Sequence, residues 1–147
     1  MHKNKSLIKA ILSIYRTSQL YISPRISEFG VGRGHWYFLN KLLFESDGIS
    51  QEELSKELVV DKAHTARAIK YLEEEDFIYC EKDPNDGRRK NIFVTDKSIE
   101  IKDDYHKIYK NLNAILVKDF TPEEVELVRI LLYKMKDNIA SYIESSD

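Results

Sequence analysis

Apolar side chains recur at three- and four-residue spacing from Leu7 to Ile22, a pattern typical of an amphipathic helix. Pro24 lacks a backbone N–H, so we expect it to end or kink this helix. A glycine-rich segment at residues 30–34 predicts a flexible connection. A second apolar helix is then predicted over residues 36–44.

Two short capped helices are predicted next. Residues 50–53 have the sequence SQEE, a capping box in which the Ser50 hydroxyl accepts from the Glu53 amide and the Glu53 carboxylate reaches back. We expect the helix that begins here to end near Leu58. After a three-residue link, Asp61 caps another helix, predicted over residues 62–75.

The pattern then changes from helical to alternating, which favours β-strands at residues 77–80 and 91–94. The intervening sequence DPNDG at residues 83–87 is typical of a turn, and three basic residues follow it. A helix-turn-helix followed by a two-stranded wing is therefore predicted over residues 36–95. In such a unit a helix fits the major groove of DNA, and a narrow hairpin can enter the minor groove.

Two long helices complete the chain. The first is predicted over residues 96–118, and the second begins at residue 121 with TPEE, a capping box with proline at the first helical position. The apolar stripe of the second helix has heptad spacing: Val125, Val128, Leu132, Met135, Ile139 and Tyr142. The usual role of such a stripe is burial inside its own chain. Because the middle of the chain already forms a compact unit, we instead expect residues 1–29 and 96–147 to be dimerisation helices of a homodimer. The predicted fold of the single chain, residues 1–147, is mainly α with a small β-wing.

The helix over residues 62–75 is the first candidate to bind DNA. Its inward stripe is predicted to be Thr65, Ala68, Ile69 and Leu72. The opposite face has small residues beside cations, which suits close approach to a groove: Lys62, Ala63, His64, Ala66, Arg67, Lys70 and Tyr71. We expect Arg67 to bond to guanine, and Lys62 and Lys70 to contact phosphates. The alternative is a solvated helix face with ion pairs to the acidic residues 73–76.

The basic turn is the second candidate. We expect Arg88 to enter the minor groove, Asp86 to hold the Arg88 guanidinium in an extended pose, and Arg89 to bind DNA beside them. The alternative is a hairpin tip whose charges deter edge-to-edge aggregation. The occurrence of this turn directly after a helix-turn-helix favours DNA binding for both segments.

Composition initially points the other way. The 147 residues include 23 basic and 25 acidic side chains, a net charge of −2 that does not by itself indicate nucleic acid. The charge is uneven, because residues 1–35 carry +5 and residues 96–147 carry −3. The amino-terminal cations are either a solvated helix face or part of an electrostatic footprint. Charges interrupt every long apolar stretch, so we expect no membrane span and a cytoplasmic protein.

Other chemistry has little support in the sequence. The four histidines are scattered and form no i, i+4 pair, so no metal site is expected. There is no phosphate-binding glycine loop or recognisable nucleophile–base arrangement, so we expect no enzyme activity and no cofactor. The single cysteine, Cys80, lies in a predicted strand and is expected to pack as a small hydrophobe.

Five motifs follow one another along the chain: GRGHW at 32–36, GISQEEL at 48–54, DKAHTARAIKYLE at 61–73, DPNDGRR at 83–89 and VT at 94–95. In this ordered series, over nearly its whole length, the chain resembles the MarR family of winged-helix transcription regulators. The resemblance implies an obligate dimer joined through both termini, a recognition helix at 62–75 and a wing arginine at Arg88. It also implies a regulator, most often a repressor, that binds a pseudo-palindromic operator in double-stranded DNA.

Many relatives in that family sense small anionic aromatic compounds or oxidants, so the resemblance implies a small-molecule effector. Arg16 and Arg33 are candidates to pair with a carboxylate, and Trp36 or Tyr37 to stack on a ring. Hinge packing by the aromatic residues, with the arginines at the surface, is the alternative. The alternative function is a winged-helix dimer that binds ligand or protein without binding DNA.

Three positions depart from the family pattern. Asp76 stands where glycine often follows the recognition helix, so this exit is expected to use a non-glycine left-handed residue or a different turn. Ser98 stands where the strand-to-helix turn often ends with glycine. His35 stands where glutamine is common.

Overall fold

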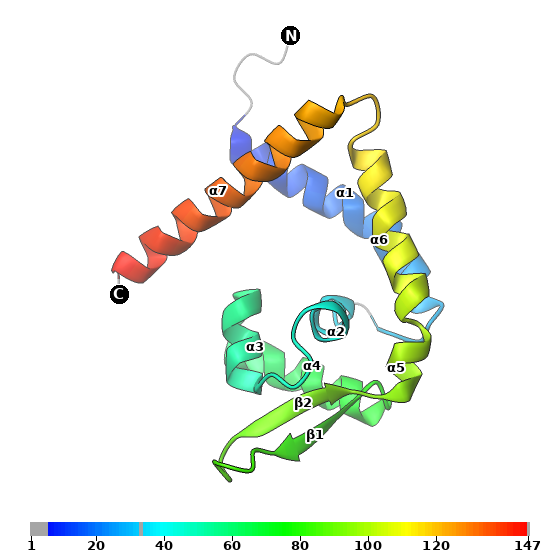
Figure 1. The fold of residues 1–147 in the computed structure, drawn as a ribbon, viewed down its shortest axis with the longest axis vertical. Helices are drawn as coiled ribbons and strands as arrows, with labels where there is room; N and C mark the ends of the chain where they lie inside the picture. The colour runs from blue at the N-terminus through cyan, green and yellow to red at the C-terminus, as the bar shows by residue number, and fades with distance from the viewer. Residues whose placement is uncertain (1–5, 33, 147) are drawn as a thin grey trace. The chain divides into compact units, whose positions relative to one another are not determined.

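The computed structural model describes residues 6–32 and 34–146, and Figure 1 shows their helices and strands. In chain order the elements are α1 (Leu7–Ser27), α2 (Trp36–Phe44), α3 (Gln51–Leu58), α4 (Lys62–Glu74), β1 (Ile78–Lys82), β2 (Lys90–Val94), α5 (Asp96–Glu100), α6 (Lys102–Leu116) and α7 (Pro122–Ser146). The chain divides into two compact units, one ending at Tyr109 and the other beginning at Lys110. Within residues 6–32 and 34–146 no helix combines the length and the hydrophobicity that a membrane span requires.

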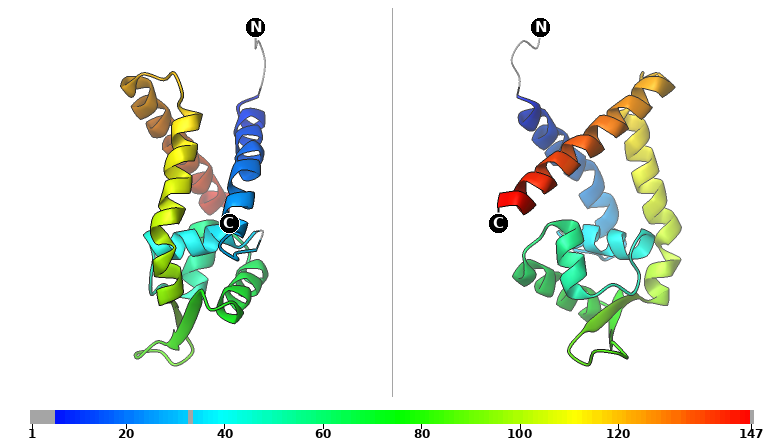
Figure 2. Two further views of the ribbon diagram at one scale, coloured as in Figure 1. Left: turned by 90° about the vertical axis from the view of Figure 1, so that its right-hand side faces the viewer. Right: turned by 60° about the vertical axis from the view of Figure 1, so that its left-hand side comes forward.

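The first unit contains the predicted winged helix-turn-helix. Strands β1 and β2 pair antiparallel, from Ile78 opposite Val94 to Lys82 opposite Lys90. Helix α2 contacts β2 and α4, while α4 contacts α3 and β1, so the three helices and the hairpin share one core (Figures 1 and 2). Its fully buried side chains come from every one of these elements: Phe38, Leu39, Leu42, Leu54, Ala68, Leu72, Ile78 and Ile92. The predicted fold, mainly helical with a small β-wing, is confirmed.

A short third segment pairs with the wing, which the sequence pattern did not predict. Ser50 forms an isolated antiparallel bridge with Asn91. The amide of Gly48 donates to the Ile92 carbonyl at 2.7 Å, and the Ile92 amide donates to the Ile49 carbonyl at 2.8 Å. The base of β2 is therefore hydrogen-bonded directly to the residues that start α3.

Pro24 does not end α1, so of the two outcomes expected for this proline, an end or a kink, the end is wrong. Helix α1 continues through Ser27. Ile22 and Ile26, on either side of the proline, are only 4% and 1% exposed, so packing holds the last turn in place. Burial of these two residues offsets the backbone hydrogen bond that proline cannot donate.

The helix predicted over residues 96–118 is two helices, because the chain turns at Ile101 between α5 and α6. The Ile101 amide donates to the Ile99 carbonyl, a shorter reach than the i−4 bond of a continuous α-helix. Ser98 lies within α5, fully buried, and its hydroxyl donates to the Phe77 carbonyl at 2.5 Å. Asp76 has φ +62°, which confirms a non-glycine left-handed residue at the exit of α4.

The second unit is dominated by α7. Its predicted capping box is complete: the Glu124 amide donates to the Thr121 hydroxyl at 3.2 Å, and the Thr121 amide donates to the Glu124 carboxylate at 2.9 Å. No residue of α7 is buried, and its large apolar side chains include Leu132, 47% exposed, and Ile139, 58% exposed. The predicted stripe is thus present on a helix that has little cover within its own unit.

Candidate nucleic-acid interface

Helix α4 begins at a strong cap and packs one stripe of side chains inward. The Asp61 carboxylate accepts from the His64 amide at 2.8 Å, and this bond is the main reason that the pKa of Asp61 lies below its usual value. The four residues of the predicted inward stripe are all buried: Thr65, Ala68, Ile69 and Leu72. The orientation of α4 about its own axis is therefore fixed by the core.

This orientation leaves one row of α4 exposed to solvent. Five of the predicted DNA-binding residues lie on it: Lys62, Ala63, Ala66, Arg67 and Lys70. Lys70 is 3.9 Å from the Glu74 carboxylate, and since both side chains are mostly exposed, this ion pair adds little stability. The small Ala63 and Ala66 side chains separate the cations, so the row can approach a groove closely.

The other two residues assigned to that face lie elsewhere. His64 is half-buried against α2, with its ring 5.5 Å from Phe38 and its Nε2 atom 3.5 Å from the Tyr37 hydroxyl. The Tyr71 hydroxyl accepts from the Gly32 amide at 2.8 Å and donates to the Gly30 carbonyl at 3.1 Å. These two side chains connect α4 to α2 and to the loop before it.

The wing turn is organised by two aspartates. Asp83 accepts from the amides of Asn85 and Asp86 at 2.8 and 3.2 Å. Asp86 in turn accepts from the backbone amide of Arg88 at 3.0 Å. We expected Asp86 to hold the Arg88 guanidinium, but its bond is to the backbone, so it fixes the course of the turn. Arg88 itself is exposed, and no carboxylate of the described residues lies within ion-pair distance of its guanidinium.

Arg89, which we expect to bind DNA, lies in ion pairs with two carboxylates. Its Nη2 atom is 2.5 Å from Glu53 Oε1 on α3, and its Nε atom is 3.8 Å from Asp83 Oδ2. The expected capping box at the start of α3 is therefore only half formed. The Ser50 hydroxyl accepts from the Glu53 amide at 3.2 Å, but the Glu53 carboxylate pairs with Arg89 rather than reaching back.

A shallow cleft of about 650 Å³ lies between the wing and the first turns of α3 and α4. Its charged lining residues are three carboxylates, Glu52, Glu53 and Asp86, and five cations, Lys56, Lys62, Arg88, Arg89 and Lys90. Lys56 and Lys90 were not among the residues expected to bind DNA. Lys56 follows the buried Leu54 and Ser55 on α3, so the helical period would have placed it on the exposed side.

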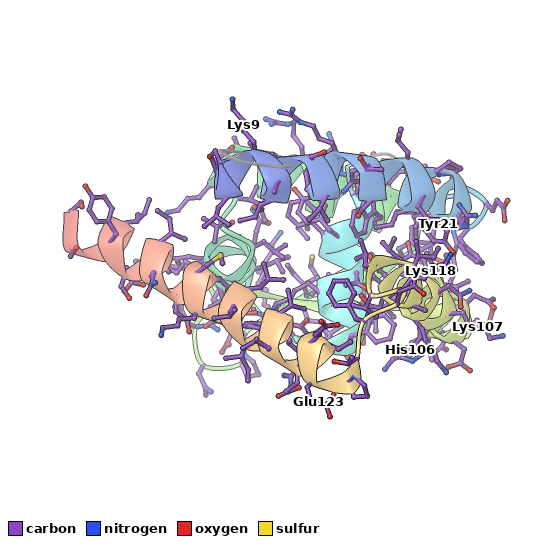
Figure 3. The ribbon with its side chains drawn as sticks, turned by 90° about the horizontal axis from the view of Figure 1, so that it is seen from above. Lys9, Tyr21, His106, Lys107, Lys118 and Glu123 are labelled. Atoms are coloured by element: carbon purple, nitrogen blue, oxygen red, sulfur yellow. The ribbon has the colours of Figure 1, made fainter. Side chains whose placement is uncertain are left out.

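The residues proposed for an effector are partly brought together. The Trp36 ring lies 5.8 Å from Tyr37 and 5.9 Å from Tyr109 of α6. Arg16 is exposed on α1, and Arg33 lies outside the described residues. Lys9, on the same helix as Arg16, projects outward from it (Figure 3). Sequence reasoning missed Tyr109 because it belongs to a helix assigned to dimerisation.

Several polar atoms beside these aromatic rings are buried. The Tyr105 and Tyr109 hydroxyls and His35 Nδ1 have no hydrogen-bond partner among the described residues. Burial raises the pKa of both tyrosines well above the ordinary range. Burial, and then the charge of His64, lowers the pKa of His35. The side chains of His35, Tyr105 and Tyr109 are therefore mainly uncharged at pH 7.

Neither metal nor thiol chemistry is indicated within residues 6–32 and 34–146. No three metal-ligating side chains of this part of the chain lie together. Burial, with a contribution from Glu73, raises the pKa of the Cys80 thiol to about 12. A thiol with this pKa is almost entirely protonated at neutral pH and is a poor nucleophile.

The fold and the exposed row of α4 beside a basic wing define a winged helix-turn-helix protein. Residues 41–90 match the model of the MarR family. A MarR transcriptional regulator from Methanosarcina mazei Go1 is 35% identical, with 91% of this chain and 96% of that chain covered and a TM-score of 0.85. The chain belongs to the MarR family.

Two further relatives agree with this assignment. The HTH-type transcriptional regulator BilQ of Clostridioides difficile (strain CD3) is 29% identical over 90% of this chain and 89% of its own. A putative MarR family transcriptional regulator from Listeria monocytogenes has been solved in complex with a 26mer DNA. It is 26% identical to this chain, with a TM-score of 0.87, and the match covers 98% of this chain and 97% of that chain. The protein is thus a DNA-binding transcription regulator and not an enzyme.

Proposed function

We propose that this regulator is a cytoplasmic homodimer that binds a pseudo-palindromic operator. It represses transcription by covering the promoter. The observation that carries the proposal is the exposed row of α4, in which small residues separate Lys62, Arg67 and Lys70 beside the wing. In related geometries two such helices enter successive major grooves about 34–36 Å apart.

The contacts divide into base readout and phosphate binding. Arg67, in the middle of the exposed row, is the residue that reads a base, because a guanidinium can donate two bonds to guanine. Lys62 and Lys70, together with Lys56 of the cleft, bind phosphates. Arg88 enters the minor groove from the tip of the wing, where the negative potential is concentrated.

The dimer interface consists of the terminal helices, within residues 1–29 and 96–147. Helix α1 exposes large apolar side chains over about its first four turns, including Leu7, 68% exposed, and Leu20, 77% exposed. Helix α7 exposes a comparable set. Apolar surface of this extent on both termini is stabilised when it is removed from water, and a second copy of the chain provides matching helices. Light scattering is expected to give twice the mass of one chain, and a stable monomer would contradict this interface.

The effector site is proposed at the aromatic cluster of Trp36, Tyr37 and Tyr109, with Arg16 and Arg33 as candidate partners of a carboxylate. The unpartnered hydroxyls of Tyr105 and Tyr109 support it, because buried polar groups ordinarily have a hydrogen-bond partner. A small anionic aromatic compound would stack on the rings and bond to these groups. It would act by favouring a dimer whose half-site spacing does not fit the operator.

The experiment is a mobility-shift series with DNA from upstream of the protein's own coding sequence, at increasing salt. Affinity is expected to fall steeply, because each phosphate contact releases a counterion and contributes about −0.9 to the slope of log K against log salt. Arg88→Ala is expected to weaken binding and leave the dimer folded. Lys107→Ala removes the same charge at an exposed position of α6, outside α4 and the wing, and serves as the control once light scattering shows that this variant is still a dimer. Equal affinity of the Arg88 and Lys107 variants would refute the wing assignment.

A second variant tests base readout. Arg67→Ala is expected to cost about 1–3 kcal/mol and to relax the preference at one base position. An equal loss on every sequence would make Arg67 a phosphate contact. Complete absence of salt-dependent binding by the wild-type protein would instead favour a winged-helix dimer that binds ligand or protein.

A further inference from the structure

We propose that Arg89 is a positioning residue that holds the wing against α3 through Glu53, and that it does not itself contact DNA. The inference rests on the proposed mode of DNA binding. It assigns to Arg89 a role different from that of its neighbour Arg88, although the two arginines are adjacent in the same basic turn.

Arg89 is fixed in the hairpin by its backbone. The Asp83 amide donates to the Arg89 carbonyl at 2.9 Å, and the Arg89 amide donates to the Asp86 carbonyl at 3.0 Å. From this fixed position its side chain leaves the wing and reaches Glu53 on α3, with 2.5 Å between Nη2 and Oε1. This ion pair joins the wing to the first helical turn of α3.

The same guanidinium also faces the carboxylate that shapes the wing turn. Asp83 accepts from the Asn85 amide, from the Asp86 amide and, at 3.1 Å, from the Asn91 side chain, and its Oδ2 atom lies 3.8 Å from Arg89 Nε. The turn shaped by Asp83 continues directly to Arg88, whose amide donates to Asp86. A continuous series of contacts therefore runs from Glu53 on α3 to the backbone of Arg88.

The charges in the cleft agree with this division of roles. Binding of a phosphate by Arg89 would require its guanidinium to leave two carboxylates, and Glu53 would then face the phosphate without a partner. A carboxylate near DNA ordinarily weakens binding through repulsion. The position of Glu53 in a DNA-facing cleft is explained if its contribution is to hold the wing.

Removal of the Glu53 charge by an isosteric substitution has opposite effects on DNA affinity under the two possible roles of this residue. If Glu53 acts only through its charge, Glu53→Gln tightens DNA binding by removing a negative group from the cleft. If it positions the wing, Glu53→Gln weakens binding, by about two- to fivefold, the range expected for a surface ion pair. Glu52→Gln is the matched control, because Glu52 lines the same cleft and makes no side-chain bond among the described residues.

The experiment measures affinity and salt slope for a duplex selected by the wild-type protein from a randomised pool. Glu53→Gln and Arg89→Gln are expected to weaken binding to a similar extent, the double variant no further than either single one, and the salt slope to stay at the wild-type value. Arg89→Lys, which retains one ionic contact, is expected to recover part of the loss. Thermal unfolding confirms that each variant is folded, and the lysine variant provides the second test if Arg89→Gln is not.

Two results would overturn the inference. One is a salt slope reduced by about one phosphate in Arg89→Gln, which makes Arg89 a phosphate contact. The other is a Glu53→Gln variant that binds as well as Glu52→Gln or better. Neither result affects the wider proposal, which fails separately if the wild-type protein selects no sequence or if Arg88→Ala binds like wild type.

Discussion

Removal of the Tyr71 hydroxyl is expected to loosen α4, the proposed DNA-reading helix, from the rest of its unit. This hydroxyl accepts from the Gly32 amide at 2.8 Å and donates to the Gly30 carbonyl at 3.1 Å, so one atom links α4 to the loop between α1 and α2. The Tyr71 ring also stacks on His35, with the ring centroids 4.5 Å apart. Tyr71→Phe removes both hydrogen bonds and retains the ring.

The cost can be estimated from these contacts. A hydrogen bond of this kind contributes about 0.5–1.5 kcal/mol, and water reaches part of the loop, so we expect the two bonds together to contribute about 1–2 kcal/mol. A change of 1 kcal/mol shifts the Tm of a chain of this size by about 2–4 °C. The expected decrease in Tm is therefore about 2–8 °C.

The assay is thermal unfolding at one fixed protein concentration, because the Tm of a dimer depends on concentration. Tyr79→Phe is the matched control, since Tyr79 stacks on Phe93 at 5.5 Å and its hydroxyl makes no hydrogen bond among the described residues. Equal Tm values for the two variants would refute the assignment of Tyr71 as a link. Gly32→Ala provides an independent check. Its Cβ would lie 2.9 Å from the Tyr71 hydroxyl and displace it, so the Tm of this variant is also expected to fall.

Three further predictions concern the thiol, the cap of α3 and acid stability. Because the pKa of Cys80 is raised to about 12, iodoacetamide at pH 8 is expected to label the folded protein far more slowly than the urea-unfolded protein, and equal rates would show that the thiol is not protected. Ser50→Ala removes the hydroxyl that accepts from the Glu53 amide and is expected to cost about 1 kcal/mol in urea unfolding, whereas Ser50→Thr should lose much less. Backbone amide bonds hold the pKa values of Asp61 and Asp83 below their usual value of 3.8 in the folded state. The stabilisation from these two carboxylates is therefore complete above their unfolded-state pKa, and it is lost as the pH falls through their lower folded-state pKa values. The urea midpoint of the wild-type protein should accordingly decrease below about pH 4. The decrease should be smaller in Asp61→Asn.

Most of the fold could be predicted because its signals are local. The capping residues Ser50, Asp61 and Thr121 each act within one turn of the helix that they start, and all three helices begin where predicted. Alternation likewise located both strands of the wing. The course of α1 past Pro24 could not be predicted because it depends on packing between distant segments. Pro24 was expected to end or kink α1, but the helix continues through Ser27 with Ile22 and Ile26 buried, and no local pattern shows that burial.

The candidate interface divides in the same way. The periodicity of α4 separated the buried Thr65 and Leu72 from the exposed Arg67, because one face of a helix can be read from spacing alone. It did not separate Arg88 from Arg89. That distinction arises from a contact with Glu53, 36 residues earlier in the chain, which forms only when the wing lies beside α3.

Whether two copies of α4 read an inverted repeat can be measured by selecting duplexes from a randomised pool with the wild-type protein and sequencing those retained. We expect an enriched inverted repeat whose half-site centres lie about 10–10.5 base pairs apart, one turn of the double helix. Retained duplexes with no common sequence, or with one unrepeated site, would contradict it.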